Sequence, residues 1–389
     1  MDMAELQEAP SAALEAAPGL SMLEAVREIA DGPLRRVAEA TDRGVYPRDL
    51  LQALGSAGAY SAHIAPGLQA GDYASAISAM SEVSRICGAT GFMVWCQQVC
   101  GLYLQQSANP ALTGARLAAH SRGARLGGTG MSNPMKAYAG IETLLLRATP
   151  VAGGGYRVSG TLPWVSNLGP DHYAGVLAGV DQADGEETGE NEREIMFLLP
   201  CDAPGVELRN CPSFSAMEGT NTWAIRCTDV FIGKDEMLAD PARPYIARIR
   251  SAFVLLQTGF GLGVAQGAID SMWRVEPQLG HVNRYLEDRP DELQDELDAL
   301  TARIKGLCAT PFSTDKEHLI NLLDVRAHAS ELALRAAQSA LLHAGARGYL
   351  LSSDVQRRVR ESHFVAIVTP AIKHLRKEIA RLSTPELPA

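Results

Sequence analysis

The side chains best suited to bind a metal or to act as nucleophiles are the nine histidines and the seven cysteines. No histidine falls in an HExxH pattern, and no two cysteines form a CxxC pair. Cys96 and Cys100 lie four residues apart on one face of a predicted helix, with no histidine at metal-ligand spacing. No serine sits in a GxSxG elbow. We therefore predict no metal site, no hydrolase chemistry and seven reduced thiols.

A glycine-rich stretch at Gly259, Gly261 and Gly263 invites a dinucleotide-binding interpretation. That fingerprint requires a preceding strand and an acidic residue about 20 residues further on. These glycines lie instead inside a long stretch of helical periodicity, where small residues let neighbouring helices approach closely. We predict close helix packing here and no nucleotide site.

The composition excludes several classes of partner. A net charge of -10 has the wrong sign for a surface that neutralises phosphates, so nucleic acid is not an expected partner. The N-terminus has neither the basic nor the apolar region of an export signal. The longest unbroken apolar stretches, such as residues 252–256, are far shorter than the ~20 residues of a membrane span. We expect a cytoplasmic protein without a membrane partner.

The hydrophobic pattern divides the 389 residues into segments of different character. Residues 1–20 are acidic and rich in alanine and proline, and are predicted to form a flexible arm. Residues 21–125 carry helical periodicity, and residues 126–240 carry short alternating runs between glycine and proline turns. Residues 241–389 return to long helical stretches. The predicted fold class is α+β, with an N-terminal helical domain, a middle antiparallel β domain and a C-terminal four-helix bundle.

Four motifs, in this order, resemble those of the acyl-CoA dehydrogenase superfamily. TGMSNP at residues 129–134 is similar to the family's T-E-P turn, and GYRVSGTLPWVSN at residues 155–167 to its G-x-x-L-N-G-x-K-x-W-I-T-N hairpin. TDVFIGKDEML at residues 228–238 resembles its strand exit. ARGY at residues 346–349, followed by RRVRE at residues 357–361, is similar to its G-x-G-Y and later R-D. The ordered set identifies the chain as a member of this superfamily.

The resemblance implies a flavin, normally FAD, between the β domain and the bundle of a homo-oligomer, either a tetramer or a dimer. In the matching positions, Thr129, Met131 and Ser132 line one edge of the flavin. Trp164 and Ser166 contact the ring near its reactive nitrogen. The alternative interpretation is that Trp164 belongs to the core of the β domain and Ser166 to a turn.

The catalytic glutamate of the family is missing. Its usual position holds Thr369, and the position used by other members holds Phe253. A hydroxyl cannot replace a carboxylate base in the abstraction of an α-proton. We expect Thr369 to cap a helix that begins at Pro370, with catalysis as the alternative role. Glu361 and His363 are the candidates for a displaced base, since carboxylates and histidine side chains commonly serve as general bases.

Several positions that contact the cofactor or the substrate in the family also differ from its pattern in this sequence. The element that receives the CoA arm is replaced by residues 135–139, and the glutamine before the G-x-G-Y segment is Leu342. CoA recognition is therefore in question, and FMN is an alternative to FAD. Arg347 and Gly348, within the G-x-G-Y segment, are predicted cofactor-binding residues, because Arg347 could pair with a phosphate. The alternative for Arg347 is a solvated position at a helix end.

Three functions follow from these features. The first is an FAD-dependent oxidoreductase that desaturates an acyl thioester, such as a CoA ester, or a related small molecule with an atypical base, and passes electrons to an acceptor. The second is a monooxygenase of the same fold that receives reduced flavin from a partner reductase and needs no α-proton base. The third is a scaffold subunit that has lost catalysis.

Overall fold

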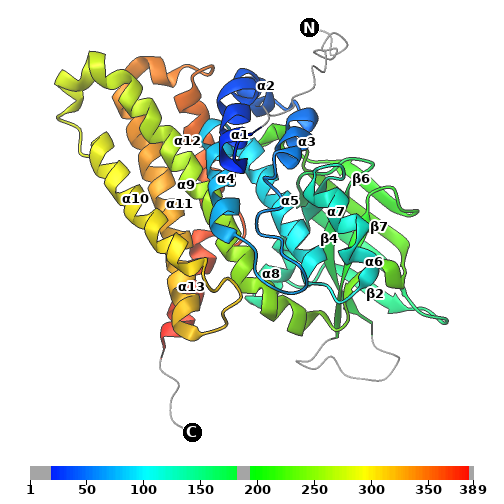
Figure 1. Ribbon diagram of the computed structural model, residues 1–389. Helices are drawn as coiled ribbons and strands as arrows, with labels where there is room; N and C mark the ends of the chain where they lie inside the picture. Colours follow the sequence, from blue (N-terminus) through cyan, green and yellow to red (C-terminus); the bar gives the residue numbers. More distant parts are fainter. Residues whose placement is uncertain (1–18, 182–192, 385–389) are drawn as a thin grey trace, which may run out of the picture.

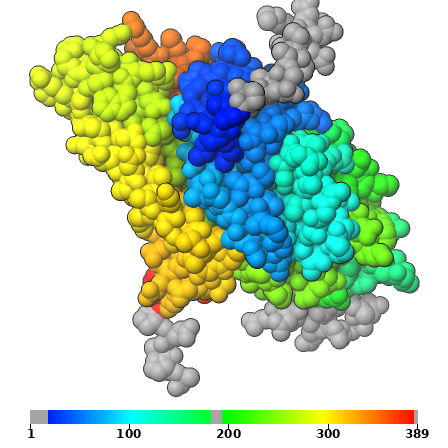
Figure 2. Space-filling model, viewed as in Figure 1, coloured from blue at the N-terminus to red at the C-terminus, as the bar shows by residue number. Residues whose placement is uncertain are grey.

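The computed structural model describes residues 19–181 and 193–384. The predicted arm, residues 1–20, therefore lies almost entirely outside the described residues. The β domain lies on one side of the molecule and the long C-terminal helices on the other (Figure 1). In the space-filling view the N-terminal helices, drawn in blue, lie between them (Figure 2).

Short helices make up the N-terminal third. They are α1 (Met22–Ile29), η1 (Ala30–Leu34), α2 (Arg35–Asp42), α3 (Arg48–Ser56), α4 (Tyr73–Ile86), α5 (Gly88–Gln106), α6 (Pro110–Thr113) and α7 (Ala115–Ser121). Every residue of α5 is buried. Its glutamine side chains are buried along with its apolar ones, and α5 packs against the sheet, the other N-terminal helices and the bundle. It is the central element of the molecule.

The middle of the chain forms one twisted sheet. Its elements are β1 (Gly127–Thr129), α8 (Ser132–Tyr138), β2 (Leu146–Pro150), β3 (Tyr156–Val165), β4 (Tyr173–Val180), β5 (Glu194–Pro200), β6 (Val206–Asn210), η2 (Glu218–Thr220), β7 (Trp223–Ile232), η3 (Lys234–Glu236) and β8 (Met237–Ala239). The strand order is β6-β7-β3-β2-β4-β5-β8, and β1 pairs with β4. The prediction of an antiparallel sheet needs a correction, because β2 and β1 both run parallel to β4. The β2–β3 hairpin reverses the chain, and the connection from β3 to β4 then crosses to the other side of β2.

The C-terminal part is helical, as predicted. It contains α9 (Ala242–Asn283), α10 (Pro290–Leu307), α11 (Lys316–Ala344), η4 (Gly345–Tyr349), α12 (Asp354–Ile367) and α13 (Ile372–Ser383). Four long stretches were expected to form the bundle, and α12 adds a further helix that packs against α9 and α11.

The 42-residue helix α9 is the core of the bundle. A Cβ atom at Gly263 would lie 2.3 Å from the carbonyl oxygen of Ser81 in α4, and one at Gly261 would lie 3.0 Å from that of Ala329 in α11. The prediction that these glycines serve close helix packing is confirmed. By length and composition alone α9 could cross a membrane, but 94% of its most apolar window is buried inside the protein. Burial against α4 and α11 accounts for that composition.

Candidate active site

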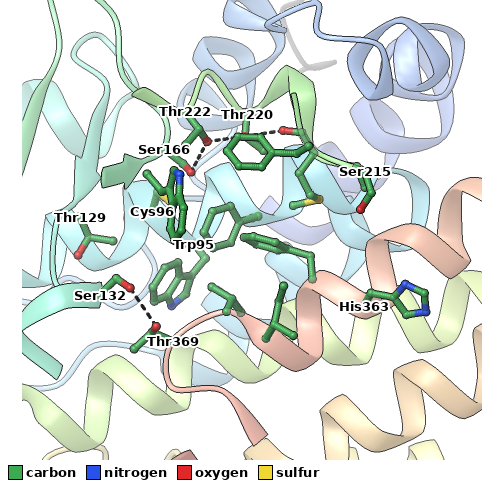
Figure 3. Close-up of a pocket in the computed structure, with 18 of the residues that line it drawn as sticks. Trp95, Cys96, Thr129, Ser132, Ser166, Ser215, Thr220, Thr222, His363 and Thr369 are labelled. Atoms are coloured by element: carbon green, nitrogen blue, oxygen red, sulfur yellow. Dashed lines mark hydrogen bonds between the residues drawn. The ribbon is translucent and has the colours of Figure 1, made fainter. Parts of the chain in front are cut away.

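A cavity of about 420 Å³ opens where α5, the β domain and the C-terminal end of α12 meet (Figure 3). We call it the first cavity. Its walls combine aromatic rings with hydroxyl groups, and the lining residues are Phe92, Trp95, Cys96, Thr129, Ser132, Lys136, Trp164, Ser166, Phe214, Ser215, Ala216, Met217, Thr220, Thr222, Phe253, Arg360, His363, Phe364, Ile367, Val368 and Thr369.

Trp164 projects out of the sheet into this cavity because β3 is irregular at that point. Leu162 pairs with Ile225 and Val165 with Trp223, so β3 has one extra residue between these pairs. Such a bulge re-aims the side chain that it contains. Trp164 has a φ of 57°, which is rare for a residue other than glycine, and it is 58% exposed. It is therefore not a core residue of the β domain, which was the alternative interpretation.

Ser166 lies two residues after Trp164 and begins a row of three hydroxyl groups. Its Oγ lies 2.6 Å from Oγ1 of Thr222, which lies 2.8 Å from Oγ1 of Thr220 (Figure 3). Gly128 allows this segment to lie close to β1, because a Cβ atom there would come within 2.4 Å of the Ser166 carbonyl oxygen. The three hydroxyls form one polar edge of the cavity.

A second polar edge joins the β domain to the bundle. The hydroxyls of Ser132 and Thr369 lie 2.9 Å apart, and Nε2 of Gln257 donates to the carbonyl oxygen of Thr369 at 3.1 Å. The helix α13 begins at Ile372 with Ala371 as its N-cap and no side-chain capping bond. The expected capping role of Thr369 is therefore wrong, because its hydroxyl bonds to Ser132 instead.

Aromatic rings form the apolar wall opposite the hydroxyls. The rings of Phe92 and Trp95 stack with centroids 5.4 Å apart, and Phe364 meets Phe92 edge-on at 4.8 Å. Phe253 meets Trp95 edge-on at 5.2 Å. Apart from Phe253, these residues were not identified as site residues from the sequence. The only sequence signal for Phe92 and Trp95 was the long apolar run of α5, which is equally typical of a core helix.

No carboxylate lines the first cavity within the described parts of the chain. Burial and the neighbouring Cys100 raise the pKa of the Cys96 thiol, which therefore stays protonated. Lys136 is paired with Glu142 at 2.7 Å. Arg360 donates to Asp42 and to the Ser215 carbonyl oxygen, each at 3.0 Å. These groups provide no anionic base.

His363 lies at the end of the first cavity opposite to Ser132 and Thr369 (Figure 3). It is exposed, and no hydrogen bond joins it to another described residue. The structure thus brings this predicted residue to the cavity but not to the hydroxyl pair. Thr129 also lines the cavity, and its Oγ1 lies 2.7 Å from the hydroxyl of Tyr103.

Glu361 does not reach the cavity, so its predicted role as a displaced base needs a correction. It is 1% exposed and accepts hydrogen bonds from the backbone N–H of Gly88 at 2.9 Å and from Arg357 at 2.8 Å. Gly88 is the first residue of α5, where a negative charge stabilises the helix. Burial opposes the charge of Arg357, but Glu361 more than offsets this effect and raises the pKa of Arg357. Glu361 is a structural partner of α5 and Arg357.

Three other predicted site residues lie outside the first cavity. Met131 lines a neighbouring cavity instead. Arg347 is exposed and Gly348 is buried in η4, which precedes α12, whereas the first cavity is lined by the C-terminal half of α12. Within one chain the structure therefore does not bring Arg347 and Gly348 to the predicted cofactor site. Arg347 and Gly348 lie far from the first cavity because α12 separates them from it, and this helix is about 20 Å long at 1.5 Å per residue.

The second cavity, of about 270 Å³, shares only Phe253 with the first. Its lining residues are Tyr103, Met131, Met135, Tyr138, Ala139, Ile246, Ile249, Arg250, Phe253, His374, Lys377, Glu378 and Arg381. Arg250 donates to Glu378 at 2.8 Å and Arg381 at 2.7 Å. Both arginines are thus paired with one carboxylate, and Lys377 also lines the cavity, where its Nζ donates to the carbonyl oxygen of Ala139 at 2.7 Å. The hydrogen bond from Arg381 and then that from Arg250 lower the pKa of Glu378 to about 2, against the effect of burial.

The first cavity fits the ring system of a flavin, which has two apolar faces and a polar edge. Trp164 offers a flat surface for one face, while Ser166 and Ser132 offer hydrogen bonds to an edge. The volume lies within the range of roughly 300–1000 Å³ typical of ligand pockets. No group of three or more potential metal ligands occurs in residues 19–181 and 193–384. All seven cysteines are free, as predicted.

The chain is similar in sequence to known acyl-CoA dehydrogenases. Residues 20–124 match the family model described as the acyl-CoA dehydrogenase N-terminal domain. The chain is 24% identical to the short-chain specific acyl-CoA dehydrogenase of human mitochondria, over 89% of this chain and 85% of that protein. It is also 24% identical to the probable acyl-CoA dehydrogenase YngJ of Bacillus subtilis, over 92% of this chain and 96% of that protein.

Solved structures share the fold at lower identity. Butyryl-CoA dehydrogenase from Megasphaera elsdenii superposes with a TM-score of 0.79 at 18% identity, covering 92% of this chain and 96% of that one. Dibenzothiophene monooxygenase from a Paenibacillus species superposes with a TM-score of 0.76 at 16% identity, covering 92% and 96%. Dehydrogenases and a monooxygenase therefore share this architecture.

Proposed function

The chain belongs to the acyl-CoA dehydrogenase superfamily and, on that premise, we propose that it is a flavin-dependent monooxygenase that takes reduced flavin from a partner reductase. The flavin is FAD or FMN, and the substrate is a small apolar or aromatic molecule. We further propose a homo-oligomer in the cytoplasm. The monooxygenase neighbour is also described in a complex with FMN and indole, which supports such a use of the fold.

The observation that carries this proposal is the lack of a carboxylate among the described residues that line the first cavity. Removal of an α-proton from a thioester requires a base positioned in the site. The two family positions for that base hold Thr369 and Phe253, and the nearby Glu361 is buried against Arg357. Oxygen transfer needs no such base on the protein.

The residues of the cavity have distinct roles in this reaction. Trp164 supports one face of the bound ring, while Ser166 and Ser132 orient its edges. A bound reduced flavin supplies the two electrons with which one oxygen atom of O₂ enters the substrate and the other leaves as water. The aromatic wall at Phe92 and Trp95 holds an apolar substrate and excludes bulk water, which would otherwise divert the activated oxygen.

The experiment is to purify the protein and to titrate it anaerobically with oxidised and reduced FMN and FAD, followed by the intrinsic tryptophan fluorescence. Binding of reduced flavin, followed by oxygen-dependent turnover of an aromatic test substrate such as indole when a flavin reductase is added, is the expected result. Protein that binds neither redox state of either flavin would contradict the proposal.

A second candidate function is favoured by the second cavity. Arg250, Lys377 and Arg381 line it together with Glu378, the one acidic residue among its described lining residues, which leaves a net positive charge that suits an anionic group such as the phosphates of a CoA thioester. Dehydrogenation of a thioester would then require a base that the described residues of the first cavity do not offer. Bleaching of bound oxidised flavin by an acyl-CoA in the absence of oxygen separates this candidate from the monooxygenase.

A further inference from the structure

The direction of the hydrogen bonds along the row of hydroxyls at the first cavity can be worked out from its far end. Thr220 Oγ1 lies 2.6 Å from the carbonyl oxygen of Met217. A carbonyl oxygen only accepts, so the single hydroxyl proton of Thr220 points to Met217. The backbone N–H of Thr220 donates to the same oxygen at 3.1 Å, which holds this end of the row in a tight turn.

The donors of the other two hydrogen bonds follow by elimination. Because the proton of Thr220 is already used, the bond of 2.8 Å between Thr222 and Thr220 must be donated by Thr222. The proton of Thr222 is then used as well, so the bond of 2.6 Å between Ser166 and Thr222 must be donated by Ser166. Each hydroxyl has one proton and two lone pairs. Ser166 therefore has no proton left for the cavity and presents only lone pairs to it.

The environment of the row keeps this order fixed. Thr220 is 2% exposed and Ser166 is 8% exposed, so neither hydroxyl exchanges freely with bulk water. Hydrogen bonds in such a row polarise one another, which strengthens the ordered arrangement. Reversal of the row would leave the Met217 carbonyl oxygen without its hydroxyl donor, and turning Thr220 alone would place two protons between its oxygen and that of Thr222. The cost of an unmet or opposed hydrogen bond in a buried site is large compared with that of a surface bond.

The two redox states of a flavin ring differ in what they offer to such an acceptor. The central nitrogen of the oxidised ring has a lone pair and no hydrogen, whereas the same position in the reduced ring carries an N–H donor. A lone pair of Ser166 repels the first and accepts a hydrogen bond from the second. A site in which Ser166 only accepts thus discriminates between the two states by the presence or absence of a proton.

We propose that the row of Ser166, Thr222 and Thr220, anchored on the Met217 carbonyl group, makes the first cavity selective for reduced flavin over oxidised flavin. This inference rests on the proposed function, in which the first cavity holds the flavin. It assigns Thr220 and Thr222 as positioning residues that act through Ser166, and it explains how a protein that borrows its cofactor would release it after turnover.

The test compares the dissociation constants of oxidised and reduced FMN, measured anaerobically by tryptophan fluorescence, in the wild type and in variants. Thr220→Val removes the anchor of the row and lets Ser166 turn its proton toward the cavity. We expect the preference of the wild type for reduced FMN to fall by about fivefold to tenfold, the scale of one hydrogen bond. Thr220→Ser keeps a hydroxyl at this position and should restore the preference.

A matched control is available in α9. Thr258 is buried, and its hydroxyl donates to the carbonyl oxygen of Leu255, three residues earlier, at 2.7 Å, which is the same local bond that Thr220 makes with Met217. Thr258→Val should keep the full preference for reduced FMN. If Thr220→Val does not fold, Thr222→Val breaks the row at its middle and should lower the preference in the same way.

The outcomes distinguish a failure of the hydroxyl-row proposal from a failure of the proposed function. A wild type that binds reduced FMN, together with a Thr220→Val or Thr222→Val variant that keeps the full preference, would overturn the role of the hydroxyl row and leave the proposed function standing. A wild type that binds the two redox states equally would also overturn it. A wild type that binds no flavin would refute the proposed function, and the inference with it.

Discussion

The two neighbouring cavities meet at Phe253 and differ in their chemistry. The first is lined by aromatic rings and hydroxyls and, within the described residues, by no carboxylate. The second is lined by Arg250, Lys377 and Arg381, and the two arginines are paired with Glu378. An acid–base reaction on a thioester would need a carboxylate in the first cavity, where the flavin ring fits. Among the described residues, the one carboxylate that lines either cavity is instead held ionised in the second, where it is paired with arginines.

The two cavities would no longer differ in this way if Glu361 turned into the first cavity and supplied a carboxylate there. We expect Glu361→Gln to destabilise the protein by about 3 kcal/mol, because it leaves the buried Arg357 without its partner. The dependence of turnover on pH should not change. Urea unfolding and a pH profile of the rate provide the two measurements. The surface pair of Glu39 and Arg43 is the control, since Glu39→Gln should cost less than about 1 kcal/mol. Loss of a limb of the pH profile in Glu361→Gln would show that Glu361 is a base after all.

The aromatic surface of the first cavity can be removed at Trp164. We expect Trp164→Ala to weaken the binding of reduced flavin roughly 30-fold, or by about 2 kcal/mol, since a large stacked ring is lost. Trp273 is 45% exposed on α9 and lines neither cavity, so Trp273→Ala is a matched control that should bind flavin normally. Equal flavin affinity of wild type and Trp164→Ala would show that the flavin binds elsewhere.

The ion pairs of Glu378 in the second cavity should make the free energy of unfolding depend on pH in the acid range. The pKa of Glu378 in the folded protein is about 2, below its ordinary value of 4.5. Its contribution to stability is therefore complete above pH 4.5 and is lost as the pH falls from 4.5 toward 2. We expect this contribution to be about 1–2 kcal/mol after screening by solvent. Urea unfolding of wild type and Glu378→Gln at pH 6 and pH 3 should give a smaller difference at pH 3; an equal difference at both would contradict the ion pairs.

The smallest effect is expected for His363, which lies at the far end of the first cavity without a hydrogen-bond partner among the described residues. His363→Ala should change turnover by less than about twofold and leave its pH profile unaltered, since oxygen transfer needs no base at that position. Steady-state rates between pH 5.5 and 8.5 test this. If the variant loses a step near the ordinary pKa of histidine, His363 is the displaced base and the first cavity does acid–base chemistry.

The parts of this site that could be predicted from the sequence lie in short local motifs. Ser132, Trp164 and Ser166 occur in continuous segments whose pattern carries over directly. The partner of Glu361 could not be predicted in this way, because Gly88 lies 273 residues earlier and only tertiary packing brings them together. The role of Thr369 could not be predicted for the same reason, since its hydroxyl bonds to the distant Ser132 instead of capping the helix that follows.

The wall of the first cavity was also missed, for a different physical reason. Phe92 and Trp95 lie on a helix that is buried on every face. Without a solvent-exposed face, the hydrophobic pattern gives no indication of which side meets a cavity and which side meets other helices. The order of the hydroxyl row likewise depends on distances between Ser166, Thr222 and Thr220 that no spacing in the sequence reveals.

The most direct test of the difference between the two cavities is an anaerobic titration. The protein would be loaded with oxidised flavin and mixed with short-chain and medium-chain acyl-CoA while the absorbance of the flavin is recorded. We predict that the flavin stays oxidised, because the described residues of the first cavity include no carboxylate to take up the α-proton. Stoichiometric bleaching by any acyl-CoA would contradict this and would establish the protein as a dehydrogenase with a base outside the first cavity.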